Sequence, residues 1–440
     1  MKGISLFMKR TMKSSATAAL ATLALALGPG SAQAAQITVP SKEYPTMQAG
    51  VAAAKPGDTV LVLPGTYTDS SGEGVFVSIG PDKPGLQLKA AGPPGSVKIA
   101  GVVPMVSGQT WVGLWIDADN ALVEGFDISG FQTAIVAGET YGGPLTQGAR
   151  ITRNNMHDCS AFGIYLGPST NYELDGNTTH GGVLGIDVQG PSPASSEGPS
   201  WNAHIHHNRA NATSCPSGGT APTGIYVASA PGCKLDNNEC ENNGMFGIYL
   251  ASSPNCTAER NKTDNNGAVG IPGMYNAVGD GIGIYVGSSD NCTVVNNEAN
   301  NNTGCGIWVG GPDCTVSNNK ADGNASYGIA VIGGGGSTVA NNEADNNGSV
   351  GSVWSIGIWV YDNSPGCRVV SNEADNNLAD GIQTSGSCGS TFAFNVAKGN
   401  ERYDVSDWDT PATCNTYLDN RAGVAWPSLS LWDVVTPPKR

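Results

Sequence analysis

Histidine is the residue whose distribution most suggests chemistry, because all five histidines of the 440-residue chain lie between positions 157 and 207. His157 and His180 stand at equivalent positions of a repeated pattern, and Asp187 follows His180 by seven residues. An imidazole titrates near neutral pH and can exchange protons with a carboxyl group. We therefore expect His157, His180 and Asp187 to form or contact a catalytic site.

Two of the other histidines are candidate metal ligands. His204 and His206 are separated by one residue, so on a strand both side chains project from the same face. Imidazole nitrogens are common ligands of Zn²⁺ and Cu²⁺. The sequence shows no obvious third ligand, so the metal site is a hypothesis based on these two residues.

The elements that position these residues come from an internal repeat with a period of about 22 residues. The tetrapeptide Gly247–Leu250 recurs in closely similar form at Gly283–Val286, Gly306–Val309 and Gly357–Val360. Each unit holds three short segments of alternating apolar residues separated by turns, and one unit cannot bury its apolar face alone. The sequence therefore predicts an all-β fold, a right-handed parallel β-helix of roughly ten stacked coils.

Composition agrees with a fold rich in turns. The chain has 61 glycines, and only 13% of its residues are charged. Asparagine pairs recur at one turn of successive coils, where Asn tolerates a left-handed backbone and stacked amides can hydrogen-bond along the solenoid. The pairs are Asn237-Asn238, Asn296-Asn297, Asn318-Asn319 and Asn341-Asn342. Five cysteines fall at an inward position, which favours a stack of buried thiols over disulfides. They are Cys233, Cys256, Cys292, Cys314 and Cys367.

The outward position of the first segment is mostly aromatic. In chain order it reads Tyr165, Asp187, Tyr226, Tyr249, Tyr285, Trp308, Ala330, Trp359 and Gln383. Residues at one repeat position lie about 4.8 Å apart along a parallel β-helix. Rings flush with such a surface would offer their faces to sugar rings, so we expect Tyr165, Tyr226, Tyr249, Tyr285, Trp308 and Trp359 to bind a polysaccharide. The alternative is that the rings favour strands and pack on one another.

A second column is acidic and raises the question of calcium. It reads Glu241, Asp264, Asn300, Asp322, Asp345 and Asp375. Like charges one strand apart repel, so this column either faces water or binds a cation such as Ca²⁺, which prefers oxygen ligands. No cofactor follows with certainty, and Ca²⁺ is the candidate.

The repeat resembles the pectate-lyase-like superfamily, especially the carbohydrate-binding and sugar-hydrolase repeats that are also found in copper-accessory β-helix proteins. The segment Tyr44–Tyr67 resembles the capping helix and first strand of that superfamily. Helical spacing of Met47, Val51 and Ala54 would close the apolar end of the solenoid. The resemblance implies the fold, whereas the superfamily includes lyases, hydrolases, epimerases and non-enzymes.

The resemblance and the aromatic column together favour a protein that cleaves or modifies an extracellular polysaccharide. A hydrolase needs two carboxylates about 6.5–9.5 Å apart for inversion, and Asp280 and Glu197 are the candidate partners of Asp187. Lyases of the superfamily usually carry Lys or Arg on this sheet, and none stands in the column. The alternatives are a non-catalytic glycan-binding or structural surface protein and a periplasmic copper-accessory protein.

The N-terminus predicts export. Residues 1–34 combine a basic start, an apolar stretch and a small-residue cleavage site, as in a signal peptide. We expect an N-terminal cap and first strand at 35–67, the β-helix at 68–425 and a tail at 426–440. Residues 35–440 hold 18 Lys and Arg against 37 Asp and Glu, which argues against nucleic acid partners. We expect a secreted monomer, extracellular or periplasmic, without membrane insertion.

Overall fold

The computed structural model describes residues 34–68, 74–101, 111–138, 145–190, 202–211, 213, 221–267, 281–350, 354–409 and 414–426. Residues 35–440 form one compact unit. The predicted signal peptide, apart from Ala34, lies outside the described residues, and so does the predicted tail beyond Trp426. Among the described residues, no helix is long and apolar enough to cross a membrane.

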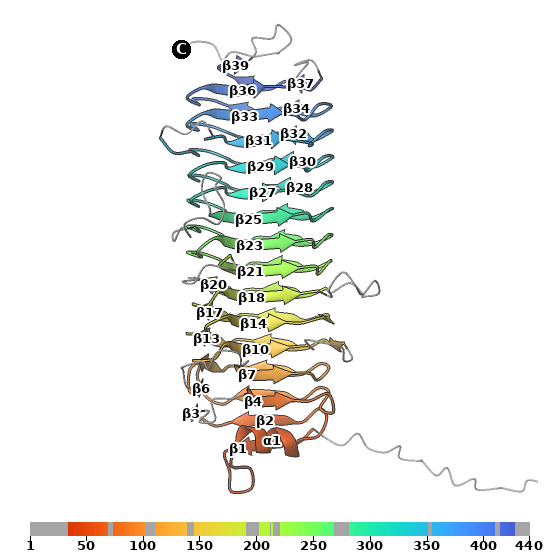
Figure 1. The fold of residues 1–440 in the computed structure, drawn as a ribbon, viewed down its shortest axis with the longest axis vertical. Coiled ribbons are helices and arrows are strands. Elements are labelled where there is room, and N and C mark those ends of the chain that lie inside the picture. Colours follow the sequence, from red (N-terminus) through yellow and green to blue (C-terminus); the bar gives the residue numbers. More distant parts are fainter. Residues whose placement is uncertain are drawn as a thin grey trace, which may run out of the picture. The chain divides into compact units, whose positions relative to one another are not determined.

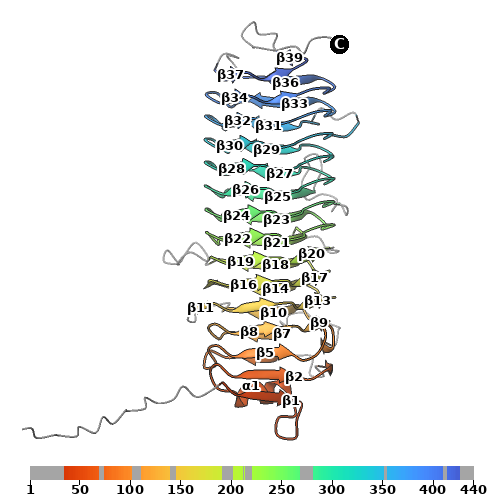
Figure 2. The same cartoon turned by 180° about the vertical axis from the view of Figure 1, so that it is seen from behind.

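The described residues of this unit form stacked coils of parallel strands (Figures 1 and 2). A 15-stranded sheet runs from β1 (Gln36–Val39) to β37 (Thr416–Leu418), and a 14-stranded sheet runs from β4 (Gly74–Ile79) to β39 (Ala425–Trp426). A third sheet of six strands spans β3 (Gly65–Thr68) to β20 (Arg209–Asn211). The right-handed parallel β-helix is therefore confirmed, with more coils than the ten expected.

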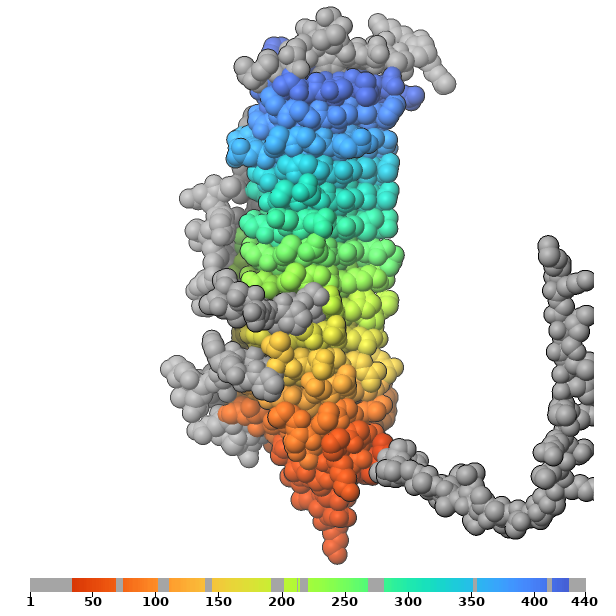
Figure 3. All heavy atoms as spheres, turned by 90° about the vertical axis from the view of Figure 1, so that its right-hand side faces the viewer, coloured from red at the N-terminus to blue at the C-terminus, as the bar shows by residue number. Residues whose placement is uncertain are grey.

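The 14-stranded sheet carries the aromatic column. Between its two end strands it contains β7 (Trp111–Ile116), β10 (Thr133–Ala137), β14 (Phe162–Leu166), β18 (Leu184–Gln189), β21 (Thr223–Ala228), β23 (Phe246–Ala251), β25 (Ile282–Gly287), β27 (Ile307–Val309), β29 (Ile329–Ile332), β31 (Ile358–Tyr361), β33 (Asp380–Ser385) and β36 (Tyr403–Asp407). The isoleucine before each column residue points inward, as in Ile248 and Ile284, which are fully buried. In the space-filling view the coils follow one another as closely packed layers (Figure 3).

Glycine precedes these isoleucines because the chain approaches itself closely there. A Cβ atom on Gly247 would lie 2.6 Å from the carbonyl oxygen of Gly283 in the next coil, and 2.9 Å from the carbonyl oxygen of Cys240. Such contacts with backbone atoms cannot be relieved by turning a side chain. The repeated glycine is therefore a packing requirement of the coil.

Asparagine ladders connect the coils inside the turns. The amide of Asn238 donates to the side-chain oxygen of Asn261 at 2.9 Å, and Asn261 donates to Asn297 at 3.0 Å. The first residue of each pair adopts a left-handed backbone, with φ of 54° at Asn237 and 56° at Asn296. Both roles expected for the asparagine pairs are thus confirmed.

The N-terminal end is closed by a short helix, α1 (Met47–Ala53), which contacts β1, β2 (Thr59–Val62) and β4. Met47, Val51 and Ala54 are at most 2% exposed, as the helical spacing predicts. The helix follows strand β1 rather than preceding the first strand of the sheet. It packs closely because Gly50 leaves room for the side chain of Val39.

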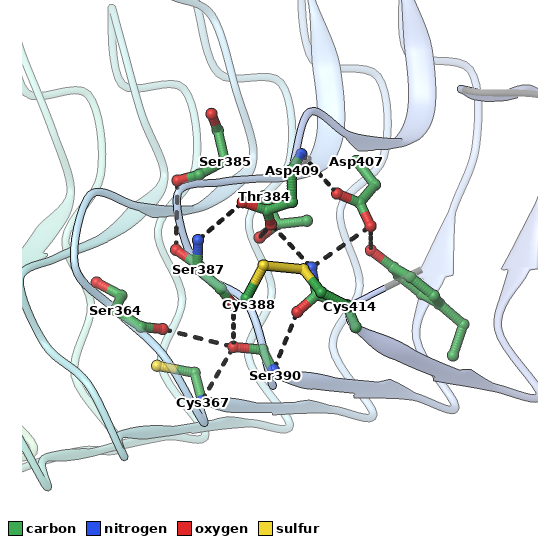
Figure 4. Close-up of a disulfide and its surroundings, with 12 residues drawn as sticks. Ser364, Cys367, Thr384, Ser385, Ser387, Cys388, Ser390, Asp407, Asp409 and Cys414 are labelled. Atoms are coloured by element: carbon green, nitrogen blue, oxygen red, sulfur yellow. Dashed lines mark hydrogen bonds between the residues drawn. A yellow bond between two sulfur atoms is a disulfide. The ribbon is translucent and has the colours of Figure 1, made fainter. Parts of the chain in front are cut away.

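The cysteines differ in state along the chain. The inward column of five cysteines consists of buried free thiols, as expected. A disulfide joins Cys388 and Cys414 near the C-terminal end, and Figure 4 shows it beside Ser387, Asp409 and Asp407. The carboxylate of Asp409 accepts hydrogen bonds from the backbone of Ser387 and the hydroxyl of Thr384. The bridge therefore ties the last coils together within a polar network.

Candidate functional site

The outward column forms one continuous strip across the 14-stranded sheet. Strand register pairs Tyr165 with Asp187, Asp187 with Tyr226 and Tyr226 with Tyr249. The same register continues through Tyr285, Trp308, Ala330, Trp359 and Gln383. We call these nine residues the aromatic strip. The alignment predicted from the sequence places every one of them correctly.

Neighbouring rings of the strip contact one another along the solenoid axis. The ring centroids of Tyr249 and Tyr285 are 4.7 Å apart with an interplanar angle of 24°, and those of Tyr226 and Tyr249 are 5.1 Å apart. Rings separated by one strand spacing and nearly parallel must face each other rather than lie flat. The expected flush arrangement is therefore wrong for Tyr249 and Tyr285, which present ring edges outward.

The strip also packs on its own hydrophobic neighbours. A cluster separate from the main core includes Phe246, Tyr327 and Trp359, with Tyr249 and Trp308 packed partly buried against it. Trp359 is only 5% exposed, because its ring packs against the rings of Tyr327 and Tyr361. Its ring offers no face to a sugar in this conformation. The strip thus combines structural packing with a partly accessible surface.

Asp187 interrupts the strip with a buried carboxyl group. Its side chain is 3% exposed, between Tyr165 and Tyr226 in the neighbouring coils. Burial raises the pKa of Asp187 to about 7, although a hydrogen bond of 2.7 Å from Nε2 of Gln189 to its Oδ1 works in the opposite direction. Burial, and secondarily the charge of Asp187, also raises the pKa of Tyr226. The carboxyl group of Asp187 thus keeps its proton to a higher pH than an ordinary aspartate, and it lies beside a phenol whose pKa is also raised.

The two predicted histidine partners lie on the third sheet. His157 and His180 pair in register between β13 (Asn155–His157) and β17 (Thr178–His180), as expected. Nε2 of His157 is 2.9 Å from Asp127 and its Nδ1 is 2.7 Å from Asp158, so both nitrogens are occupied. His180 is exposed, and no hydrogen bond joins it to Asp187 among the described residues. Asp280 and Glu197 lie outside the described residues.

A second surface near the C-terminal end was missed by sequence reasoning. Trp408 and Trp426 are 43% and 42% exposed, and the guanidinium carbon of Arg402 lies 5.7 Å from the ring centroid of Trp408 and 5.8 Å from that of Tyr403. Arg402 also donates to Gln383, the last residue of the strip, at 3.0 Å. We call Arg402, Tyr403, Trp408 and Trp426 the C-terminal patch.

The guanidinium of Arg402 is held in place by a buried carboxylate. Its Nε and Nη2 atoms donate to the two oxygens of Asp380 at 2.7 Å each, and the side chain of Asp380 is completely buried. The hydrogen bonds to Asp380 raise the pKa of Arg402. These two parallel bonds are the geometry in which a guanidinium holds a carboxylate, so they occupy Nε and Nη2 of Arg402 and leave Nη1 for a further acceptor. No sequence signal placed this arginine on the sheet, because it lies in a turn outside the repeat pattern.

The acidic column binds the backbone of the next coil. Its carboxylates accept hydrogen bonds from backbone N–H groups. The bond from Asn300 to Asp264 measures 2.7 Å. The bonds from Asp345 to Asp322 and from Asp375 to Asp345 measure 2.9 Å and 2.7 Å. The ammonium group of Lys320 lies 2.7 Å from Asp322 and also contacts Glu343. These contacts offset the repulsion that suggested Ca²⁺. The Ca²⁺ site stays a prediction.

The histidines proposed as metal ligands are both on β19 (His204–His206), in the 15-stranded sheet. Their rings stack with centroids 4.0 Å apart and an interplanar angle of 23°. Nearly parallel rings direct their nitrogens side by side instead of toward one point. The Nδ1 atom of His206 instead lies close to Asp175 and His207, two residues that the sequence pattern did not suggest.

Known proteins resemble the chain in fold. A family model described as right-handed beta helix region matches residues 135–280 and 274–421, more than half of the chain. The A-module of a mannuronan C-5 epimerase from Azotobacter vinelandii is similar over 87% of this chain and 95% of its own, with a TM-score of 0.58 and 16% identity. A mannuronic acid specific family 6 polysaccharide lyase from human gut microbiota is similar over 90% and 88%, with a TM-score of 0.56 and 16% identity.

A periplasmic alginate epimerase is also similar, over 88% of this chain and 82% of its own, with a TM-score of 0.50 and 11% identity. Identities this low establish a shared fold and leave the activity open. A search of curated protein sequences finds no match.

Proposed function

The chain belongs to the right-handed β-helix family, and on this premise we propose that it modifies a uronate-containing polysaccharide by proton transfer at Asp187. The observation that carries the proposal is the buried carboxyl group with a pKa of about 7 in the middle of the aromatic strip. General acid–base groups work best when their pKa lies near the working pH. An aspartate of ordinary pKa would be a weak base and would be fully ionised.

The chemistry that fits is removal of the proton beside a uronate carboxylate. Ionised Asp187 would take the proton from C-5 of the sugar. Delivery of a proton from water to the opposite face gives epimerisation. Departure of the oxygen at C-4, protonated by the carboxyl group of Asp187, gives elimination and an unsaturated uronate. The hydroxyl of Tyr226, whose raised pKa keeps it protonated, would donate a hydrogen bond to the charge that develops on the carboxylate. Asp187 is 3% exposed in this structure, so the reaction requires that its carboxyl group become accessible to the sugar.

A hydrolase fits the described residues less well. Hydrolysis needs a second carboxylate within about 10 Å of the first. Among the described residues of the strip, Asp187 is the only acidic side chain. The solved structures with the highest similarity reported above also carry names that refer to mannuronan and mannuronic acid. These considerations favour proton abstraction over hydrolysis.

The C-terminal patch supports an anionic substrate. Gln383 lies seven register steps beyond Asp187, which corresponds to about 34 Å at about 4.8 Å per step. A chain of several sugars would reach from Asp187 to Arg402, where the guanidinium and the exposed rings of Trp408 and Trp426 could hold a uronate.

We also propose that the protein acts outside the cytoplasm. The predicted signal peptide indicates export, and the disulfide between Cys388 and Cys414 is typical of proteins in oxidising compartments.

A second candidate function is glycan binding without catalysis. It is favoured by the contrast between the covered carboxyl group of Asp187 and the exposed rings of the C-terminal patch. In that case the pKa of Asp187 would be a consequence of packing alone.

A screen of the purified protein on neutral and acidic polysaccharides tests the proposal. Reducing ends, unsaturated uronates and the ratio of C-5 epimers are measured in parallel. Unsaturated products or epimerised residues on a polyuronate support proton transfer at C-5. Reducing ends alone indicate a hydrolase and contradict the proposal. Binding of the glycan without any product supports the second candidate.

A further inference from the structure

We propose that Asp175, His206 and His207 form a binding site for a divalent transition-metal ion of the Zn²⁺ type. The site would link two neighbouring coils of the 15-stranded sheet. It lies on a different sheet from the aromatic strip and is independent of the proposed reaction.

Three ligand atoms from two strands come together at this point. Asp175 ends β16 (Glu173–Asp175), His206 ends β19, and His207 follows in the turn. Nδ1 of His206 and Nδ1 of His207 are 3.0 Å apart, and each lies 3.2 Å from Oδ1 of Asp175. Strand register places Asp175 directly beside His206. The cluster is therefore built by the sheet itself and by the turn that follows it.

These distances fit a metal ion. The point in the plane equidistant from three such atoms lies about 1.8 Å from each, so an ion with bonds of about 2.0–2.1 Å would sit about 1 Å above the plane. Edges of a tetrahedron with bonds of this length are about 3.3 Å. The three atoms thus resemble one face of a tetrahedral site with a fourth position left over.

Hydrogen bonding alone does not satisfy the cluster. A carboxylate carries no proton, so the two imidazoles supply every proton available for the three contacts. If both Nδ1 atoms donate to Asp175, two N–H groups face each other at 3.0 Å. If one Nδ1 donates its proton to the other Nδ1, the carboxylate of Asp175 faces the lone pair of the accepting nitrogen and must share the proton of the donating nitrogen. A cation accepts electron pairs from all three atoms at once.

The surroundings suit a cation with an open coordination position. The side chains of His207 and Asp175 are 61% and 39% exposed, so water or a ligand can reach the fourth position. The side chain of His206 is 14% exposed and its ring stacks on His204, which fixes its orientation. Oε1 of Glu173 lies 3.6 Å from Nε2 of His206 and adds negative charge behind the ring.

The ligand set favours borderline ions. Two imidazoles and one carboxylate suit Zn²⁺ and Cu²⁺, whereas Ca²⁺ prefers oxygen ligands alone. Bound between β16 and β19, the ion would act as a cross-link between coils. Its open position could also hold an anionic group of a ligand.

The sequence provides a matched variant. His207 has a left-handed backbone with φ of 53°, and the residues at the same turn of later coils include Asn237, Asn296 and Asn318 with φ between 54° and 56°. His207→Asn therefore keeps the backbone of the repeat while removing one ligand. Asp175→Asn removes a second ligand with almost no change in shape. His180→Asn serves as the control, because it replaces an exposed histidine outside the cluster.

The experiment is a titration of metal-free protein, purified without a histidine tag, with Zn²⁺ in competition with a chelating dye. Absorption bands of bound Co²⁺ report coordination geometry, and circular dichroism verifies that each variant is folded. We expect one Zn²⁺ per chain, with binding weakened at least ~100-fold in His207→Asn and Asp175→Asn, above the range for loss of an outer-shell partner. His180→Asn should keep the wild-type affinity.

Three results would overturn the proposal. They are the absence of Zn²⁺ binding to the wild-type chain, unchanged affinity in both ligand variants, and equal loss of affinity in His180→Asn. The last result would place the bound ion elsewhere.

Discussion

Replacement of Asp187 by asparagine should stabilise the protein at alkaline pH while removing its proposed chemistry. The pKa of Asp187 rises from an ordinary value of 3.8 to about 7 in the folded chain because its carboxyl group is buried. In the unfolded chain the same group ionises near its ordinary value. Between these two pH values the folded state holds a proton that the unfolded state has released.

The sign of the pH dependence follows directly. Where the folded state binds more protons, the free energy of unfolding decreases as pH rises. The contribution of Asp187 is therefore fully favourable below about pH 4, and it is lost progressively up to about pH 7. The difference between 3.8 and about 7 corresponds to about 4 kcal/mol, at about 1.4 kcal/mol for each pH unit.

Asparagine has nearly the same shape and no charge, so it removes this dependence. Asp187→Asn should match the wild type near pH 4 and exceed its stability by up to about 4 kcal/mol at pH 8. For the roughly 330 residues that the structure describes, this corresponds to an increase in melting temperature of about 6 °C.

The assay is thermal unfolding of both proteins at pH 4.5 and pH 8. Asp82→Asn, at a side chain that is 73% exposed, is the control and should change the melting temperature little at either pH. A difference between wild type and Asp187→Asn that is the same at both pH values would refute the reasoning, because burial would then not control ionisation of Asp187.

The remaining predictions concern the two aromatic surfaces and the cross-links between coils. Trp408→Ala should weaken binding of a polyuronate at least ~10-fold with an unchanged melting temperature, whereas Trp308→Ala, in the packed part of the strip, should cost about 2 kcal/mol of stability. Equal melting temperatures for the two variants, measured by calorimetry, would contradict this division. Asn297→Ala leaves the side-chain amide of Asn261 without its acceptor and should lower the free energy of unfolding by about 2–4 kcal/mol. Chemical denaturation measures this loss, and a value below about 1 kcal/mol would show that the ladder is not a main source of stability. Reduction of the disulfide between Cys388 and Cys414, which closes a loop of 26 residues, should cost about 3.5 kcal/mol, and an unchanged midpoint of denaturation under reducing conditions would disprove it.

The sequence was sufficient to predict the architecture because each repeat unit corresponds to one coil. Equivalent positions in different units must lie in register, so the whole order of the aromatic strip followed from alignment of the units. The buried cysteine column, the paired asparagines and the capping helix followed from alternation and turn preference in the same way.

The site was harder to predict because it depends on directions and neighbours within a coil. Alternation places Tyr249 and Tyr285 outward, but it does not tell whether their rings lie flat or stack, and strand spacing decides in favour of stacking. The acidic column was expected to be repulsive because a pattern of side chains does not show the backbone N–H groups that donate hydrogen bonds to the carboxylates. Arg402 lies in a turn whose residues do not follow the repeat pattern.

The proposed metal site shows the same limit. His204 and His206 share a face of one strand, as predicted, yet the close ligand atoms come from His206, its neighbour in the turn and Asp175 on the adjacent strand. Repeat alignment could have identified Asp175, because it occupies the same position as His206 one coil earlier. Repeat alignment also equates His207 with the left-handed Asn237, but it does not show that the ring of His207 turns back toward Asp175.

The most direct test of the proposed function is hydrogen exchange at C-5 of a polyuronate. The wild-type protein and Asp187→Asn are incubated with the polymer in deuterated water, and deuterium at C-5 and unsaturated ends are measured by nuclear magnetic resonance. We predict deuterium incorporation or elimination by the wild type and a fall of at least ~100-fold in Asp187→Asn, with binding of the polymer retained. Wild-type rates of exchange in Asp187→Asn would contradict the assignment of proton transfer to this residue.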